Sequence, residues 1–270
     1  MCLCHTKRKK LKNLSILFLL SIGFVLMSYT TLNTHRYSVK TVVIDAGHGG
    51  KDQGTHGKLL KEKDVALSVA LKLGKIIKEN LPDVKVIYTR DSDHFVELND
   101  RALIANKNNA DVFISIHCNS SPHNDGVHGT ETYTMGLHSS KGNLNVAMRE
   151  NSSMLMEDDY NNNYDGFDPN SPESYILFNL YLSAYSDNSL NLASKIEGQF
   201  KRRVGRHSRG VKQAGFVVLW RTSMPSVLVE TGFLSNPKEE KYLGDPLGQT
   251  YIASGIYRAF RDYKKEIESI

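Results

Sequence analysis

Two histidines and two glutamates hold unusual positions in this 270-residue chain, because each stands where an apolar run gives way to a loop or a helix begins. His48 follows "VVIDAG", His117 ends "DVFISIH" and Glu230 ends "PSVLVE". Glu62 heads an apolar stripe with helical spacing, so its carboxylate is expected to point inward. Two imidazoles and one carboxylate with an open fourth position form a known catalytic zinc set. The remaining carboxylate could then act as a base.

Each of these residues also has an ordinary structural interpretation. The glycine-rich turn "GHGG" could cradle a phosphate, serve only as a tight turn, or present His48 to a metal. A phosphate role is weak because the Lys-Ser/Thr pair of a phosphate-binding loop is absent. Glu62 could be a first-turn acid favoured by the helix dipole. The convergence of four ionisable groups on one rim favours the metal site.

The elements that must position these groups alternate between strands and helices. The apolar runs "KTVVIDAG", "VKVIYTR", "DVFISIHCN", "GFVVLW" and "PSVLVETGF" are expected to be strands, and "TETYTMG" is a further candidate. Helical periodicity covers residues 62–80, 97–108 and 248–267. This alternation predicts a single α/β domain with a twisted, mostly parallel sheet flanked by helices. In such sheets ligands bind at the carboxyl ends of the strands, where His48, His117 and Glu230 are expected.

Residues 137–208 depart from this rhythm and are interpreted as a helical insertion. Helical segments are expected around "LNVAMRENSSMLME" and from "SYILFNLYL" to "EGQFKRRV". The stretch between them, "DDYNNNYDGFDPNSPE", is polar and rich in Asn and Asp, which indicates a surface loop.

The first 35 residues resemble a targeting segment. Five basic residues precede the apolar run "LSILFLLSIGFVLM", which is short for a membrane span. We interpret residues 1–35 as a signal peptide or signal anchor, so the protein is expected to be exported, with membrane contact only through this segment. Without it, the chain has 29 basic and 29 acidic residues and no net charge, which argues against a nucleic-acid partner.

The remaining candidate groups are few. Cys118 is the one cysteine after the leader, so it cannot form an internal disulfide and is expected to be a small buried apolar residue. The other histidines lie in polar or glycine-rich contexts and are expected to face solvent. Of these, His56 and His128 lie nearest the rim and are kept as substrate-side candidates.

Four ordered motifs resemble the zinc-dependent N-acetylmuramoyl-L-alanine amidases, the bacterial cell-separation amidases. They are "VVIDAGHGGKDQG", "KEKDVALSVALKL", "NDRALIAN" with "ADVFISIHCN", and "MPSVLVETGFLSNPKEE". The resemblance implies a catalytic domain at 40–268 that binds one Zn²⁺ through His48, Glu62 and His117. It also implies that Glu230 is the general base. The implied reaction is hydrolysis of the amide between N-acetylmuramic acid and L-alanine in peptidoglycan, in the periplasm or cell envelope.

The insertion resembles a segment that covers the zinc cleft in some of these amidases. Such a segment places a carboxylate at the open metal position, which water otherwise takes, until an activator protein displaces it. The stretch "MRENSSM" is similar to it, which implies Glu150 as the blocking ligand, with Glu157 as the alternative. Both could equally be solvated helix acids.

Two other functions are compatible with the same site chemistry. A peptidoglycan-binding module that kept the fold would be expected to lose a ligand or the base, and all four residues are present. A carboxypeptidase or deacetylase of the cell wall could use the same zinc set, and only the motif resemblance favours the amidase.

Overall fold

The computed structural model describes residues 38–137, 140–176 and 184–269. Residues Ser38–Ile270 form one compact unit. The expected targeting segment at 1–35 lies outside the described residues. Within the described part of the chain, every helix is too short or too polar to cross a membrane.

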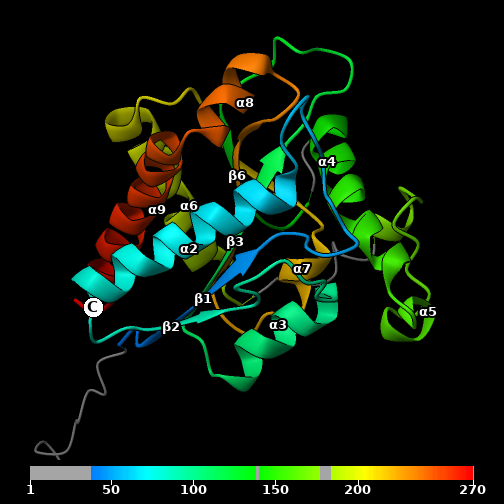
Figure 1. Cartoon of the computed structure of the whole chain (residues 1–270). Coiled ribbons are helices and arrows are strands. Elements are labelled where there is room, and N and C mark those ends of the chain that lie inside the picture. The colour runs from blue at the N-terminus through cyan, green and yellow to red at the C-terminus, as the bar shows by residue number, and fades with distance from the viewer. Residues whose placement is uncertain (1–37, 138–139, 177–183, 270) are drawn as a thin grey trace, which may run out of the picture. The chain divides into compact units, whose positions relative to one another are not determined.

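A six-stranded sheet forms the centre of the unit (Figure 1). Its spatial order is β2-β1-β3-β6-β4-β5. All neighbouring strands run parallel except β4 and β6, which are antiparallel, so the predicted mostly parallel sheet is confirmed. The strands are β1 (Thr41–Ala46), β2 (Lys85–Tyr88), β3 (Val112–Asn119), β4 (Thr130–Met135), β5 (Ser208–Ala214) and β6 (Ser226–Phe233).

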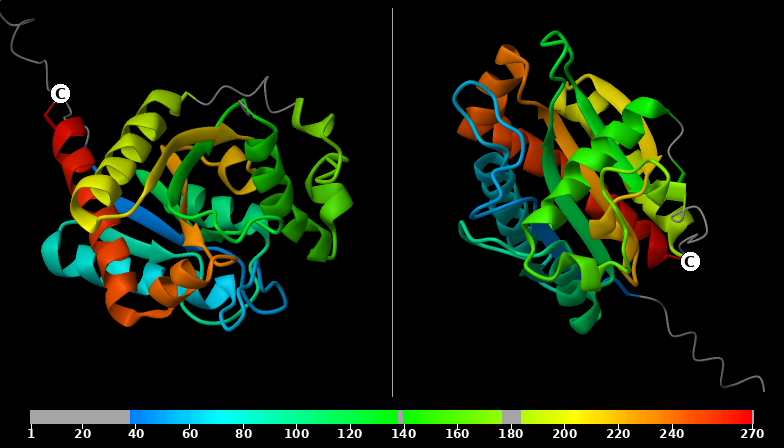
Figure 2. Two further views of the ribbon diagram at one scale, coloured as in Figure 1. Left: turned by 90° about the horizontal axis from the view of Figure 1, so that it is seen from above. Right: turned by 90° about the vertical axis from the view of Figure 1, so that its right-hand side faces the viewer.

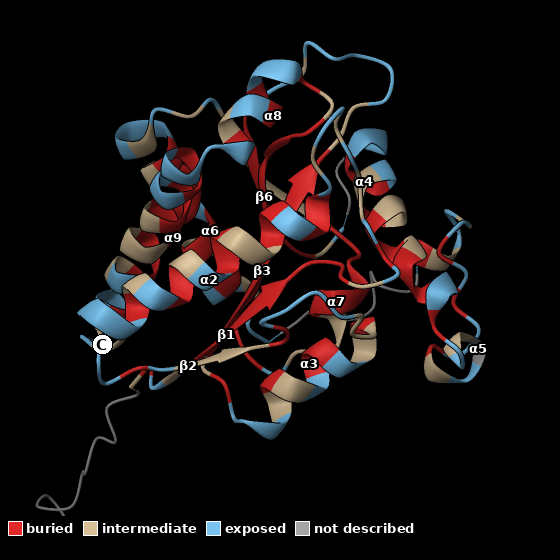
Figure 3. Cartoon of the chain, in the orientation of Figure 1, coloured by how far each residue is buried: buried red, intermediate tan, exposed pale blue. Residues whose placement is uncertain are grey.

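Helices cover both faces of the sheet and so bury the strands on both sides (Figures 2 and 3). Alternate strand residues face opposite layers: Val42 and Ile44 pack toward one face, and Val43 toward the other. The first face packs against α2 (Glu62–Asn80), α6 (Ser186–Gln199) and α9 (Pro246–Ile267). The second packs against α3 (Leu98–Lys107), α4 (Lys141–Asn151) and α7 (Val217–Trp220).

Shorter helices complete the chain. They are the 3-10 helix η2 (Ser152–Met156), α5 (Tyr160–Asn163), the π-helix η4 (Phe200–Val204) and α8 (Pro237–Gly244). The predicted polar loop after η2 contains only α5 as regular structure. The boundaries 137–208 stay a prediction for the insertion. Within them, α6 packs against α9 and the sheet, whereas α4 and η2 lie over the carboxyl ends of the strands.

The prediction that "GFVVLW" is a strand is wrong, because Val217–Trp220 form the helix α7. Its apolar side chains pack into the second core layer, and the buried Asn151 side chain accepts the Val217 amide proton at 2.9 Å. Asn151 also donates to the Gly215 carbonyl and the Tyr175 hydroxyl. The packing of these residues and their hydrogen bond with Asn151 therefore outweigh the local preference of this segment for a strand. Strand β5 was not predicted, because "SRGVKQA" lacks an apolar alternation.

Candidate metal centre

Four buried side chains from four different elements meet at the carboxyl end of the central strands. His48 follows β1, Glu62 begins α2, His117 lies in β3 and Glu150 lies in α4. One ligand atom from each lies within 4.8 Å of all the others. Glu150 Oε2 is 3.1 Å from His48 Nε2 and 3.0 Å from His117 Nδ1. Glu62 approaches the same two nitrogens at 3.1 and 3.0 Å.

The loop that carries His48 is fixed by two buried arginines. His48 has a φ of 59°, a left-handed conformation that is unfavourable for a residue with a Cβ. Arg101 donates to the His48 carbonyl at 2.9 Å and pairs with Asp45 at 2.8 Å, while Arg90 donates to the Gly47 carbonyl at 2.8 Å. These bonds hold the turn in its strained form and thereby set the position of the imidazole.

Two glycines leave room for the ligands. A Cβ on Gly47 would lie 2.5 Å from the His117 ring. A Cβ on Gly54, whose φ is +63°, would lie 2.5 Å from both Glu62 Oε2 and the His48 ring. The glycine-rich turn is therefore required by the close approach of these side chains rather than by a phosphate.

Asp52 orients the His48 ring from the side opposite the cluster. Its Oδ2 lies 2.8 Å from His48 Nδ1 and also accepts the Ser153 hydroxyl at 2.7 Å. Burial raises the pKa of Asp52, but its bonds with His48 and Ser153 outweigh that effect and hold it at about 2. An anionic carboxylate on one ring nitrogen is the usual partner of a metal-binding histidine.

The donor set fits a divalent metal. His48 Nε2 and Glu150 Oε2 are buried and make no hydrogen bond within the described part of the chain. Unsatisfied buried polar atoms are costly, so a group that accepts their lone pairs would stabilise the arrangement. Imidazole nitrogens together with carboxylate oxygens suit zinc among the common metals.

Glu230 lies beside this cluster in β6, in register with His117 of β3. Both its carboxylate oxygens are buried and make no hydrogen bond with the described residues. Burial raises the pKa of Glu230 well above its usual value, and the charge of Glu150 raises it further. A carboxylate whose pKa is shifted toward neutrality can accept and return a proton near physiological pH.

A family of sequences described as N-acetylmuramoyl-L-alanine amidase matches residues 42–262. The chain belongs to this family. It is 35% identical over 225 residues to the N-acetylmuramoyl-L-alanine amidase AmiA of Escherichia coli K12, which covers 83% of this chain and 76% of AmiA. This amidase therefore hydrolyses peptidoglycan at the amide between N-acetylmuramic acid and L-alanine.

Two solved amidases share its fold. The N-acetylmuramoyl-L-alanine amidase of Clostridium difficile 630 aligns with a TM-score of 0.63 and 28% identity, over 84% of this chain and 97% of its own. The CwlD amidase of Clostridioides difficile, in complex with the GerS lipoprotein, aligns with a TM-score of 0.62 and 28% identity, over 84% and 99%. The family assignment favours the amidase over the carboxypeptidase and deacetylase that the site chemistry alone left open.

In this amidase the segment Lys141–Met156, hereafter the α4–η2 segment, packs against the cluster. Arg149, Glu150 and Ser153 all reach into it: Arg149 Nη2 lies 3.7 Å from Glu230 Oε1, and Ser153 contacts Asp52. A cavity of only about 10 Å³ remains between His48, His117 and Glu150, which is space for one water molecule.

The buried ionisable groups of the amidase site shift one another's pKa values. Burial lowers the pKa of His117, but Glu150 and Glu62 outweigh that effect and raise it to about 9. Burial raises the pKa of Glu150, but Arg149 and His117 outweigh that effect and lower it well below its usual value. The geometry thus keeps Glu150 ionised beside the two imidazoles.

The structure places the other candidate residues away from the cluster. Glu157, the alternative to Glu150, accepts the Leu98 amide proton at 2.8 Å and the Tyr164 hydroxyl proton, and so joins η2 to α3. His56 and His128 are exposed, and His128 lines a surface groove of about 550 Å³ near the start of α8. Cys118 is buried, as expected.

Sequence reasoning missed several residues that shape the site. Asp52 contacts His48 and is itself held by Ser153, Arg101 holds the turn of His48, and Arg149 faces Glu230. An acid four residues after a candidate histidine was an available signal for Asp52. Arg149 and Ser153 gave no such signal, because their role depends on how the α4–η2 segment folds back onto the sheet.

Proposed function

We propose that His48, Glu62 and His117 bind one zinc ion and that Glu230 is the general base of the amidase reaction. The observation that carries this proposal is the convergence of four buried ligand atoms within 4.8 Å of one another, beside the buried Glu230. Zinc in this position would acidify a water molecule and polarise the substrate carbonyl.

The chain's own residues account for the proton transfers. Glu230 accepts a proton as water adds to the lactyl carbonyl carbon, and it delivers that proton to the nitrogen of L-alanine as the C–N bond breaks. The products are a lactyl carboxylate and a free amine. Asp52 keeps the His48 ring oriented with Nε2 toward the cluster.

We further infer that the α4–η2 segment is autoinhibitory. Glu150 would take the fourth metal position, which explains why its Oε2 lies within 3.1 Å of both imidazoles. Arg149 would at the same time face Glu230 and bind the Asn119 side chain at 3.0 Å. Activity would then require this segment to leave the sheet edge.

A partner protein is the natural agent of that displacement. The related CwlD amidase is found in complex with a lipoprotein, which shows that an amidase of this fold can hold a protein partner. We propose that an envelope protein captures the displaced segment. We also propose that residues 1–35 export the chain to the periplasm or cell envelope, where its substrate lies.

A muropeptide digestion tests these assignments together. Residues 36–270 loaded with zinc are incubated with purified muropeptides, with and without a chelator, beside a Glu230→Gln variant. The products are read by mass spectrometry. We expect free stem peptides with N-terminal L-alanine, lost on chelation and reduced by about 10²- to 10⁴-fold in the variant.

Deleting residues 141–190 separates the possible causes of inactivity. Cleavage that appears only after deletion would support autoinhibition. Glu230→Gln protein that keeps both its zinc and full activity would remove Glu230 from the mechanism. A chain that binds zinc and glycan tightly but cleaves nothing in either form would overturn the catalytic proposal.

A further inference from the structure

Arg209 and Lys212 of β5 lie close to the proposed base, Glu230, but outside the metal cluster. Arg209 Nε donates to Glu131 Oε1 at 2.6 Å, and Lys212 Nζ donates to the same oxygen at 2.5 Å. Glu131 of β4 is paired directly with Glu230 of β6 across the antiparallel strands. Residues that oppose each other in this way project from the same face of the sheet at a Cβ separation of about 5 Å. The two cations therefore lie next to Glu230, on the same face of the sheet.

A bulge in β5 brings both cations to this face. Thr130 pairs with Ser208 and Thr132 pairs with Val211, so β5 has one residue more than β4 over this interval. Gly210 absorbs the extra residue with a φ of +90°. Residues three apart in a regular strand point to opposite faces. The bulge instead aims both Arg209 and Lys212 at Glu131.

The cluster carries more positive charge than Glu131 requires. Glu131 is 2% exposed and already accepts from the Asn119 amide at 3.0 Å and the Tyr133 hydroxyl at 2.8 Å. One cation would balance its single charge. The second exceeds what Glu131 alone requires and lies beside Glu230, where the proposed function places the peptide of the substrate.

Most donors of the two cations remain available. A guanidinium has five N–H donors and an ammonium three, and within the described part of the chain each side chain gives one hydrogen bond, to Glu131. Their side chains are 35% and 22% exposed. Arg209 lies over the Phe233 ring at 5.3 Å, and Lys212 lies 5.8 Å from the Tyr133 ring centre, so both heads are held in position.

We propose that Arg209 and Lys212 form a carboxylate-binding subsite that recognises an acidic residue of the stem peptide close to the scissile amide. This inference rests on the proposed function, because that function places the peptide beside Glu230. Such an acidic residue can be present either as a free carboxylate or as its amide. The subsite binds the free carboxylate and gains little from the amide, because charge-assisted hydrogen bonds are the stronger kind.

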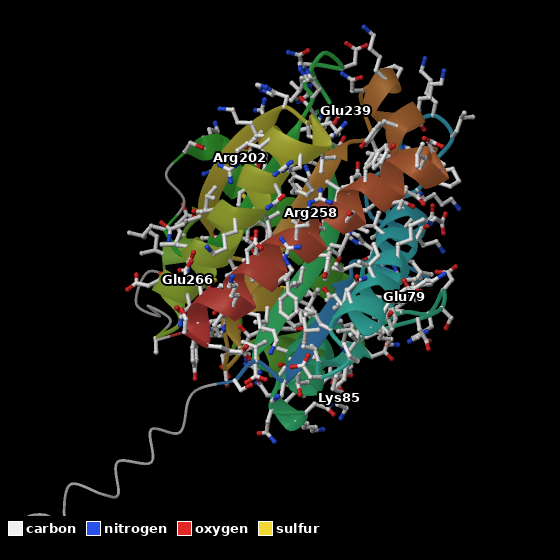
Figure 4. The ribbon with its side chains drawn as sticks, turned by 90° about the vertical axis from the view of Figure 1, so that its left-hand side faces the viewer. Glu79, Lys85, Arg202, Glu239, Arg258 and Glu266 are labelled. Atoms are coloured by element: carbon white, nitrogen blue, oxygen red, sulfur yellow. The ribbon has the colours of Figure 1, made fainter. Side chains whose placement is uncertain are left out.

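Paired substrates test this selectivity. Two muropeptides that differ only in that carboxylate, one free and one amidated, are compared on the zinc-loaded chain in the wild-type and Glu150→Ala backgrounds. The test variant is Arg209→Gln with Lys212→Gln. The control is Lys85→Gln with Arg202→Gln, which removes the same two charge types from exposed positions elsewhere on the molecule (Figure 4).

We expect the test variant to raise KM for the free-carboxylate substrate by about tenfold, with kcat changed less than about twofold, because one charge-assisted interaction is lost. KM for the amidated substrate should stay unchanged, as should both substrates with the control variant. A loss of fold would instead lower kcat equally for both substrates. Equal KM values for the two substrates in the parent, or an equal rise for both in the variant, overturn the subsite.

Equilibrium binding separates this proposal from the proposed function. The same muropeptides are titrated into zinc-loaded Glu150→Ala/Glu230→Gln protein by calorimetry, with and without the β5 substitutions. Carboxylate-dependent binding without cleavage in any background would retain the subsite and overturn the assigned reaction. Cleavage of both substrates without discrimination in either measurement would retain the reaction and overturn the subsite.

Discussion

Arg149 Nη2 lies 3.7 Å from Glu230 Oε1, so a helix of the α4–η2 segment places a cation against the proposed base. The adjacent residue, Glu150, lies between the two histidines, and Arg149 also donates to Glu150 Oε1 at 2.9 Å. Two consecutive residues thus contact the two parts of the proposed active site: the metal cluster and the proposed base, Glu230. The autoinhibition that we propose for this amidase would therefore need only these two side chains, and not a large covering domain.

Glu150→Ala should raise the basal rate of muropeptide cleavage by about tenfold or more, because a charge-assisted contact that holds the closed form is removed. The measurement is initial rate at saturating zinc. Glu173→Ala is the control, since Glu173 is an exposed acid of the same insertion. A Glu150→Ala rate equal to that of the control would contradict the blocking role.

Arg149→Gln should also raise the basal rate, because it frees Glu230 and removes the bond to Asn119. Arg149 and Glu150 leave the site together with one helix, so their effects should not add. We expect the double variant to reach about the rate of the faster single variant. If the rate increase of the double variant instead equals the product of the two single increases, the two residues block the site independently.

Gly54→Ala should weaken zinc binding by about 10- to 100-fold, because the new Cβ would displace both Glu62 and His48. Gly205→Ala is a matched control: its φ is +75°, so the backbone cost is similar, but no atom lies within 4 Å of its added Cβ. Zinc affinity is measured by competition with a chromophoric chelator. Equal losses in the two variants would attribute the effect to backbone strain alone.

Glu131→Gln should change how stability depends on pH. Burial raises the pKa of Glu131, but Lys212 and Arg209 outweigh that effect and lower it below its ordinary value of 4.5. A depressed pKa contributes stability that is fully present above the unfolded value and is lost as pH falls through the folded value. The stability difference between wild type and Glu131→Gln should therefore be constant near neutrality and shrink below about pH 4.5.

Denaturant unfolding across pH 3 to 7 gives that difference. Glu197→Gln provides a control of opposite sign, because burial raises the pKa of Glu197 despite its bonds with Ser208 and Thr132. Wild type should gain stability relative to this variant as pH falls through the raised pKa. If the stability difference between wild type and Glu131→Gln instead grew as pH falls, the pKa of Glu131 would be raised rather than lowered in the folded protein.

The candidate site could be predicted because polar residues at the ends of apolar strands have few structural reasons to be there. His48, His117 and Glu230 each end or follow such a run, and the sheet brings strand ends together. The strands β1, β3 and β6 were predictable because their buried apolar character is local. What the sequence could not convey were contacts between distant segments.

The element "GFVVLW" illustrates that limit. Its apolar residues fit a strand as well as a buried helix, and four residues are too few for periodicity to decide. The hydrogen bond from the Val217 amide to Asn151, 66 residues away, helps fix the helix. Strand β5 could not be predicted because its sequence looks polar. Its Arg209 is charged but pairs with the buried Glu131, and the bulge at Gly210 interrupts the alternation of residues.

The side chain of Asn151 has a further consequence, because it follows Glu150 directly and also accepts the amide proton of Val217. Any motion that carries Glu150 out of the cluster must withdraw this acceptor and leave the first amide of α7 without its partner. The rate of hydrogen exchange at the Val217 amide therefore measures the fraction of molecules in which Glu150 has left the cluster. It should accelerate in Glu150→Ala protein while amides in the middle of α9 keep their protection.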